Sequence, residues 1–179
     1  MKYKIIATDM DDTLLNSSHE ISEENIQSII EVQEKGVKFV LASGRPTFAM
    51  HSFANELDMK RLGGYILGYN GGEIIDVSTG DIIFEKALTR GDIEVIYNEA
   101  KNNELSFLTY SDDTIYGDEW NEYTTEEVTL TGMKWKEINS FDELPIEKSI
   151  KCMILGEPKK LTAVQKKLQE KYKQDYVIN

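Results

Sequence analysis

The chain has 179 residues, of which 40% are hydrophobic, a composition that supports one folded domain or two small ones rather than a disordered segment. Its formal net charge of -12 argues against a surface for nucleic acid or for an anionic membrane, because both need a basic patch, and favours a cytoplasmic protein. No apolar segment approaches the roughly 18 residues of a transmembrane helix, and the one cysteine excludes an internal disulfide.

The first half of the chain alternates strand-like and helix-like patterns. The apolar run Ile5–Thr8 ends in Asp9, Asp11 and Asp12, which predicts a buried strand followed by an acidic turn. A helix with Ser22 as its N-cap comes next. A strand, a helix, another strand and a hairpin are expected at residues 37–42, 47–57, 65–69 and 73–85. The apolar face of the helix at 47–57 should comprise Phe48, Phe53, Ala54 and Leu57.

The second half has a different pattern and predicts a separate α+β module. Helices are expected to begin near Thr89 and at Pro158, and a hairpin turn is expected within residues 110–116. Strands are expected at residues 105–110, 151–155 and from 176 onward, whereas the pattern of residues 118–131 is ambiguous and fits a short helix and a loop. Cys152 lies in an apolar strand, which favours a buried, inert thiol. The predicted domains are 1–85 and 86–179.

The acidic turn after the first strand is the strongest candidate for chemistry. Carboxylates at the C-terminal end of a parallel strand lie where open α/β sheets bind their ligands. Asp9 and Asp11, two positions apart, could together hold a magnesium ion, which prefers one or two carboxylates with phosphate oxygens and water. One carboxylate could attack phosphorus as a nucleophile, and the other could act as general acid and base. A bare Asp-x-Asp is more often a solvated turn.

Three motifs that follow one another along the chain favour a catalytic site over a solvated turn. Asp9-Met10-Asp11-Asp12-Thr13 resembles the first motif, Asp-x-Asp-x-Thr, of the haloacid dehalogenase superfamily of phosphatases. Ala42-Ser43-Gly44-Arg45-Pro46 is similar to its second motif, and Asn70-Gly71 resembles the end of the third strand in the Cof-type branch. That branch mostly dephosphorylates sugar phosphates and similar small metabolites. The resemblance therefore implies an α/β fold: a partial Rossmann-like core of three parallel strands plus a hairpin, followed by an α+β cap.

The resemblance also implies roles for individual residues. Asp9 would be the nucleophile and a magnesium ligand, and Asp11 would be the general acid/base that also offers the metal its backbone carbonyl. The phosphate would be bound by backbone N–H groups around Met10, by the hydroxyl of Ser43 and by the amide of Gly44. Arg45 could contact the phosphate or substrate, or form only a salt bridge. Asn70 would line the site, although Asn-Gly is more often just a turn.

Two departures from the family pattern matter. Asp12 stands where the family usually has glycine, and aspartate tolerates left-handed backbone angles better than most residues. No residue can be assigned to the family's lysine or to its acidic fourth motif, both of which follow the cap. The 179 residues are therefore expected to be the N-terminal part of such a phosphatase and to be inactive alone. The first strand would then have an unpaired edge, through which the chain could self-associate.

Two other functions stay open at this stage. A phosphomutase would share the first two motifs, and a non-catalytic protein that binds phosphorylated ligands would need neither the lysine nor the fourth motif. Specificity in the family rests on the cap, whose residues match no recognisable motif, so the substrate is expected only to be a small phosphorylated metabolite.

Overall fold

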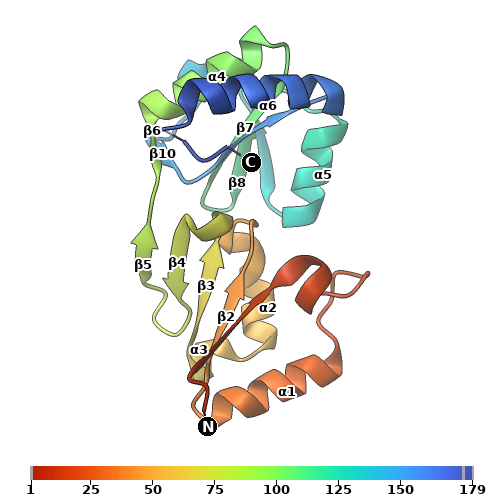
Figure 1. Cartoon of the computed structure of the whole chain (residues 1–179), viewed down its shortest axis with the longest axis vertical. Coiled ribbons are helices and arrows are strands. Elements are labelled where there is room, and N and C mark those ends of the chain that lie inside the picture. The colour runs from red at the N-terminus through yellow and green to blue at the C-terminus, as the bar shows by residue number, and fades with distance from the viewer. Residues whose placement is uncertain (1, 175, 179) are drawn as a thin grey trace. The chain divides into compact units, whose positions relative to one another are not determined.

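The computed structural model describes residues 2–174 and 176–178, and the chain separates into two compact units, Met1–Ala87 and Leu88–Asn179 (Figure 1). We call them unit 1 and unit 2 and describe each by itself. Both combine helices with a β-sheet, which confirms the α/β class expected from the sequence.

Unit 1 is built on a five-stranded sheet whose strands follow one another in chain order. The first three strands are parallel, and the last two continue the sheet as an antiparallel hairpin, as the sequence predicted. The strands are β1 (Ile5–Asp9), β2 (Lys38–Ala42), β3 (Gly64–Gly68), β4 (Glu73–Asp76) and β5 (Ile82–Glu85).

Helices and helical turns connect the first four strands of unit 1. They are η1 (Met10–Leu14), α1 (Glu23–Glu34), η2 (Thr47–Met50), α2 (His51–Glu56), α3 (Met59–Leu62) and η3 (Tyr69–Gly71). Ser22 caps α1 as expected, since its hydroxyl accepts a hydrogen bond of 3.3 Å from the backbone N–H of Asn25. The helix expected at 47–57 begins instead as the 3₁₀ turn η2. Because this turn changes the direction of its side chains, Phe48 is 43% exposed, and its prediction as a core residue was wrong.

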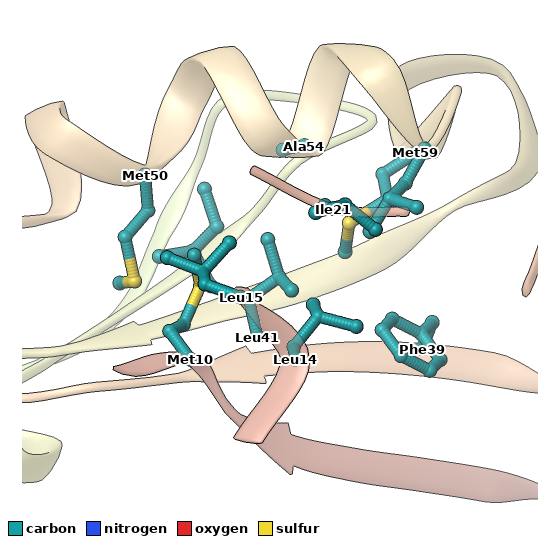
Figure 2. Close-up of a cluster of buried hydrophobic side chains, with 11 residues drawn as sticks. Met10, Leu14, Leu15, Ile21, Phe39, Leu41, Met50, Ala54 and Met59 are labelled. Carbon is teal, nitrogen blue, oxygen red and sulfur yellow. The ribbon is translucent and has the colours of Figure 1, made fainter. Parts of the chain in front are cut away.

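A single apolar cluster packs α1, α2 and α3 against the sheet of unit 1. Figure 2 shows the labelled side chains of this cluster between the α2 region and the strands. Its fully buried members are Met10, Leu41, Met50, Ala54, Leu57, Met59 and Ile66. Met10 follows Asp9 directly and is fully buried in this cluster, so packing of its side chain fixes the position where the acidic turn begins.

Strand β1 lies at the edge of its sheet and pairs with β2 alone among the described residues. Ile5 is 58% exposed and Ile6 38% exposed, so the prediction of a buried strand was wrong. The reason is the position of β1 in the sheet. An edge strand has a neighbouring strand on one side only, so no second strand shields its apolar side chains from solvent. An exposed edge of this kind is a template for pairing with another strand.

Unit 2 contains a four-stranded sheet in the order β11-β7-β8-β9 and a separate two-stranded sheet of β6 and β10. Its strands are β6 (Leu88–Thr89), β7 (Ser106–Ser111), β8 (Thr114–Gly117), β9 (Lys134–Glu137), β10 (Lys148–Ser149) and β11 (Cys152–Leu155). Its helices are α4 (Arg90–Asn102), α5 (Glu122–Thr131), η4 (Phe141–Glu143) and α6 (Pro158–Tyr172).

The sequence located most of these elements but not all of them. The predicted helices near Thr89 and at Pro158 are α4 and α6, and the predicted hairpin is β7–β8. The ambiguous stretch 118–131 contains α5, which Asn121 caps through its side chain. The final strand expected from residue 176 was wrong, because residues 176–178 have no strand structure; its continuation to Asn179 lies outside the described residues.

Candidate active site

The carboxyl ends of β1, β2 and β3 lie side by side in unit 1. Asp9 at the end of β1 is in register with Ala42 of β2, and Ala42 is in register with Leu67 of β3. Because all three strands are parallel, the turns that follow them meet at one edge of the sheet. These turns carry every site residue that the sequence predicted.

The turn after β1 presents Asp9 to solvent. The hydroxyl of Thr13 donates a hydrogen bond of 3.3 Å to Oδ2 of Asp9, so the carboxylate is held by its own turn. The turn closes where the N–H of Leu15 donates to the carbonyl of Met10 at 2.9 Å. Asp12 adopts φ 56°, in the left-handed region, which explains how it occupies a position where glycine is usual in the family.

The turns after β2 and β3 are tied together through the backbone. The N–H of Ser43 donates to the carbonyl of Leu67 at 3.0 Å, and the N–H of Asn70 donates to the carbonyl of Ser43 at 3.0 Å. A Cβ on Gly44 would lie 2.9 Å from Oδ1 of Asn70, so glycine is what lets the Asn70 side chain approach. The predicted residues Ser43, Gly44 and Asn70 are therefore brought together.

Arg45 and Asp11 form a two-point ion pair between the first two turns. Nε of Arg45 donates to Oδ2 of Asp11 at 2.9 Å, and Nη2 donates to Oδ1 at 2.6 Å. The hydrogen bonds and the positive charge of Arg45 lower the pKa of Asp11, against the opposing effect of burial. His19, whose Nδ1 is 3.9 Å from Oδ1 of Asp11, contributes a smaller effect in the same direction.

The sequence did not predict this pairing or the partner of Thr47. The hydroxyl of Thr47 donates a hydrogen bond of 2.5 Å to the buried carboxylate of Glu73, which links η2 to the start of β4. The pairing of Arg45 with Asp11 could have been predicted from residue types, because the second motif places an arginine in the turn that follows β2, and the neighbouring strand β1 ends in an acidic turn. No local pattern connects Thr47 to Glu73, 26 positions away.

The oxygen donors of the first turn suit a hard divalent cation. Asp9 supplies an exposed carboxylate, and the backbone carbonyl of Asp11 comes two residues later. Magnesium uses one or two carboxylates and completes its shell with water and phosphate oxygens, so this donor set fits it. Among residues 2–174 and 176–178, no three His, Cys, Asp or Glu side chains are grouped so that they could hold a metal.

The fold is an α/β fold with polar turns at the carboxyl ends of its parallel strands, and comparison with known proteins identifies its family. Residues 6–179 match the family model described as haloacid dehalogenase-like hydrolase. The chain belongs to this family, and the resemblance inferred from the three motifs is confirmed.

Individual relatives agree with this assignment. The chain is 31% identical to YxeH of Bacillus subtilis (strain 168) over 179 residues, which cover 95% of the chain and 65% of YxeH. It is 31% identical over 123 residues to the 5-amino-6-(5-phospho-D-ribitylamino)uracil phosphatase YcsE of the same organism, covering 69% of the chain and 48% of YcsE. The chain thus spans less than two thirds of the length of these relatives.

Solved structures show the same fold. A haloacid dehalogenase-like hydrolase from Bacteroides thetaiotaomicron superposes with a TM-score of 0.88 at 40% identity, covering 95% of this chain and 64% of that one. The subclass IIB sugar phosphatase BT4131 shares the fold with a TM-score of 0.70 at 18% identity, covering 91% of this chain and 62% of its own. None of the helices in the described part of the chain is long and apolar enough to cross a membrane.

Proposed function

We propose that the protein is a magnesium-dependent phosphohydrolase that acts on small phosphorylated metabolites, sugar phosphates among them. The observation that carries the proposal is the convergence of the turns bearing Asp9, Asp11, Ser43 and Asn70 at one edge of the parallel sheet. Family membership and the phosphatase name of YcsE support it.

In the proposed reaction the carboxylate of Asp9 attacks the phosphorus atom. The bond between phosphorus and the ester oxygen breaks, Asp11 gives a proton to the leaving alcohol, and an aspartyl-phosphate remains. Asp11 then takes a proton from water, which attacks phosphorus, and Asp9 is regenerated as inorganic phosphate leaves. Throughout, the Ser43 hydroxyl and the amides near Met10 and Gly44 would donate hydrogen bonds to the phosphate oxygens.

The metal has a limited place in this scheme. The carboxylate of Asp9 and the backbone carbonyl of Asp11 would hold Mg²⁺, which supplies positive charge against the phosphate oxygens when bound. Asn70, whose backbone is fixed to Ser43, would line the substrate side of the site.

The two units would divide these tasks as core and cap, with residues 1–85 as the core and 86–179 as the cap. We further infer a cytoplasmic location and no nucleic-acid partner, which the acidic net charge of -12 supports. The identity of the metabolite would depend on unit 2.

We expect the 179 residues alone to release little or no phosphate and to self-associate through β1. No lysine among them is assigned to balance the charge of the nucleophile and the phosphate. The exposed Ile5 on an edge strand supports the pairing of β1 with a second copy. Sedimentation over a range of concentrations tests this, and Ile5→Lys should shift the chain toward monomer.

The enzymatic proposal is tested by phosphate release with and without Mg²⁺. Sugar phosphates and p-nitrophenyl phosphate would be offered to the chain and to the polypeptide encoded by the complete reading frame. We expect turnover by the complete polypeptide that needs Mg²⁺ and is abolished by Asp9→Asn. Robust turnover by the 179 residues would refute their inactivity, and turnover that survives Asp9→Asn would refute the mechanism.

A non-catalytic phospho-ligand-binding protein is the second candidate. The observation that favours it is the ion pair between Arg45 and Asp11, whose hydrogen bonds lower the pKa of Asp11 and so favour a paired carboxylate over a proton donor. Calorimetry that shows phosphosugar binding without Mg²⁺, together with no turnover by the complete polypeptide, would support it over the hydrolase.

A further inference from the structure

The Arg45 side chain is among the most firmly fixed charged groups near the proposed acid/base. Its backbone N–H donates to Oγ of Ser43 at 3.1 Å, and its carbonyl accepts from the N–H of Tyr69 at 2.9 Å. Its side chain is 6% exposed, and its guanidinium carbon lies 5.9 Å from the centroid of the Phe53 ring. Three elements, the turn after β2, η3 and α2, therefore determine where the guanidinium lies.

Asp11 is the less constrained partner of the pair. Its side chain is 41% exposed, and it precedes Asp12, whose left-handed backbone turns the chain sharply. A two-point contact between a guanidinium and a carboxylate fixes orientation as well as distance. Because Arg45 is buried and Asp11 is not, the guanidinium is the anchor and the carboxylate is the group that is held.

Resting on the phosphohydrolase function proposed above, we propose that Arg45 is a positioning residue that orients the Asp11 carboxylate for proton exchange with the leaving group and does not bind the substrate phosphate. Two donors of the fork, Nε and Nη2, are already used by the two oxygens of Asp11. Each carboxylate oxygen keeps a second lone pair, so the held carboxylate can still exchange a proton with the ester oxygen.

A lysine could not replace Arg45 in this role. Its ammonium is a point charge on a flexible stem and cannot make two parallel hydrogen bonds to one carboxylate. Arg45→Lys therefore keeps the charge and removes the orientation. A proton donor displaced by about 1 Å costs on the order of 100-fold in rate.

The first test uses the 179-residue chain and needs no turnover. The NMR signal of the Arg45 Nε–Hε group, assigned by its loss in Arg45→Lys, should be protected from exchange with water and become unprotected in Asp11→Ala. It should stay protected when inorganic phosphate is added at concentrations that shift the Ser43 and Gly44 amide signals. Free exchange in the wild type, or loss of protection on phosphate binding, would overturn the proposal.

Phosphate that shifts neither amide would count against the proposed function, while the Asp11→Ala comparison would still decide whether Arg45 holds Asp11. The two failures are therefore distinguishable. Thermal unfolding of each variant shows whether it is folded. If Arg45→Lys fails to fold, the Nε–Hε signal is assigned through its bonds to the Arg45 backbone, and the Asp11→Ala comparison still decides the result.

The second test uses the complete polypeptide and two leaving groups. Arg45→Lys should lower the first-turnover rate of alcohol release from a sugar phosphate by about 100-fold and that of p-nitrophenolate release by less than about 10-fold, because p-nitrophenolate leaves without a proton. The first turnover is measured because hydrolysis of the aspartyl-phosphate, in which Asp11 acts as base, is the same step for both substrates. KM should change little for either substrate. An equal loss for both substrates, with a raised KM and weaker inhibition by inorganic phosphate, would instead show that Arg45 binds the phosphate.

The matched control is Arg61→Lys. Arg61 also pairs with an aspartate in unit 1, Asp58, through a hydrogen bond of 2.5 Å, but its side chain is 58% exposed. This variant should leave both leaving-group rates unchanged. A leaving-group dependence equal to that of Arg45→Lys would overturn the assignment to Arg45.

Discussion

Charged side chains are placed differently in the two units. In unit 1 they gather in turns at strand ends, where Asp9 is exposed and Asp11 is held by Arg45. In unit 2 the buried Glu99 of α4 joins two helices, accepting hydrogen bonds from Lys171 at 2.5 Å and from Tyr172 at 3.0 Å. A group that reacts must be accessible to its substrate, whereas a buried carboxylate that joins two helices acts through the hydrogen bonds that it accepts from them. The first kind should therefore control activity and the second kind stability.

The largest expected effect is that of Asp9→Asn on turnover. The substitution removes the nucleophile, so kcat of the complete polypeptide should fall at least about 1000-fold. The melting temperature should hardly change, because Asp9 is exposed and the hydrogen bond that its carboxylate accepts from Thr13 is a long one of 3.3 Å. Steady-state kinetics and thermal unfolding of the same preparation measure both. A large loss of stability would break the contrast between the units.

A second large effect is expected on the rate at which the thiol of Cys152, in unit 2, reacts with an alkylating agent. Burial raises the pKa of Cys152 to about 12, against a smaller lowering by its hydrogen bond to Thr109. At pH 8 this leaves on the order of 1000-fold less thiolate than in an unfolded chain. Alkylation by iodoacetamide, followed by mass spectrometry, should be at least about 10-fold slower in the native chain, because the greater nucleophilicity of a high-pKa thiolate offsets part of the difference in thiolate fraction. Equal rates in native and urea-unfolded chains would show that the strand does not shield the thiol.

Glu99→Gln should change stability and leave the site intact. We expect a loss of about 1–3 kcal/mol in the free energy of unfolding, because Lys171 and Tyr172 would then donate to a neutral amide oxygen instead of a carboxylate. Urea denaturation of the purified chain measures this loss. Inhibition of the complete polypeptide by phosphate should be unchanged.

The pH dependence of that loss has a definite sign. The pKa of Glu99 is lowered below its ordinary value of 4.5, mainly by the hydrogen bond from Lys171. The contribution of the Glu99 carboxylate to the free energy of unfolding is therefore fully present above about pH 4.5 and disappears as the pH falls through the lowered native pKa. The difference between wild type and Glu99→Gln should shrink on acidification below pH 4.5, and a difference that grows would contradict the assignment.

Asp12 offers the smallest effect and tests the backbone of the acidic turn. Asp12→Ala should cost about 1 kcal/mol in the free energy of unfolding, because alanine is disfavoured at φ 56°, and Asp12→Gly should cost nothing or slightly stabilise. Urea unfolding of the two variants gives the comparison. If alanine were tolerated as well as glycine, the left-handed turn would not be a constraint.

The sequence predicted unit 1 better than unit 2 for physical reasons. Ser22, Gly36 and the apolar runs are local signals, and they located α1, β2 and β3. The parallel strand β9 depends on which strands lie next to each other, and short-range patterns do not carry that information. The unpaired edge of β1 was predicted only through the family resemblance, and its position at the edge of the sheet confirms that prediction among the described residues.

The candidate site shows the same limit. The three motifs predicted which turns would carry polar residues, and the parallel sheet brings those turns to one edge. The partner of Arg45 was left open between substrate and salt bridge, because the choice depends on a contact across 34 positions. Burial of the guanidinium could not be inferred from a turn sequence, since turns are usually exposed.

The most direct test of the proposed chemistry is the detection of a phosphoryl group on Asp9. The complete polypeptide would be mixed with substrate and Mg²⁺, quenched in acid during turnover, and analysed by peptide mass spectrometry. We predict one added phosphoryl group on the peptide that contains Asp9, its absence without Mg²⁺, and its absence in Asp9→Asn. Turnover with no phosphorylated Asp9 peptide, or with the phosphoryl group on another residue, would contradict the account.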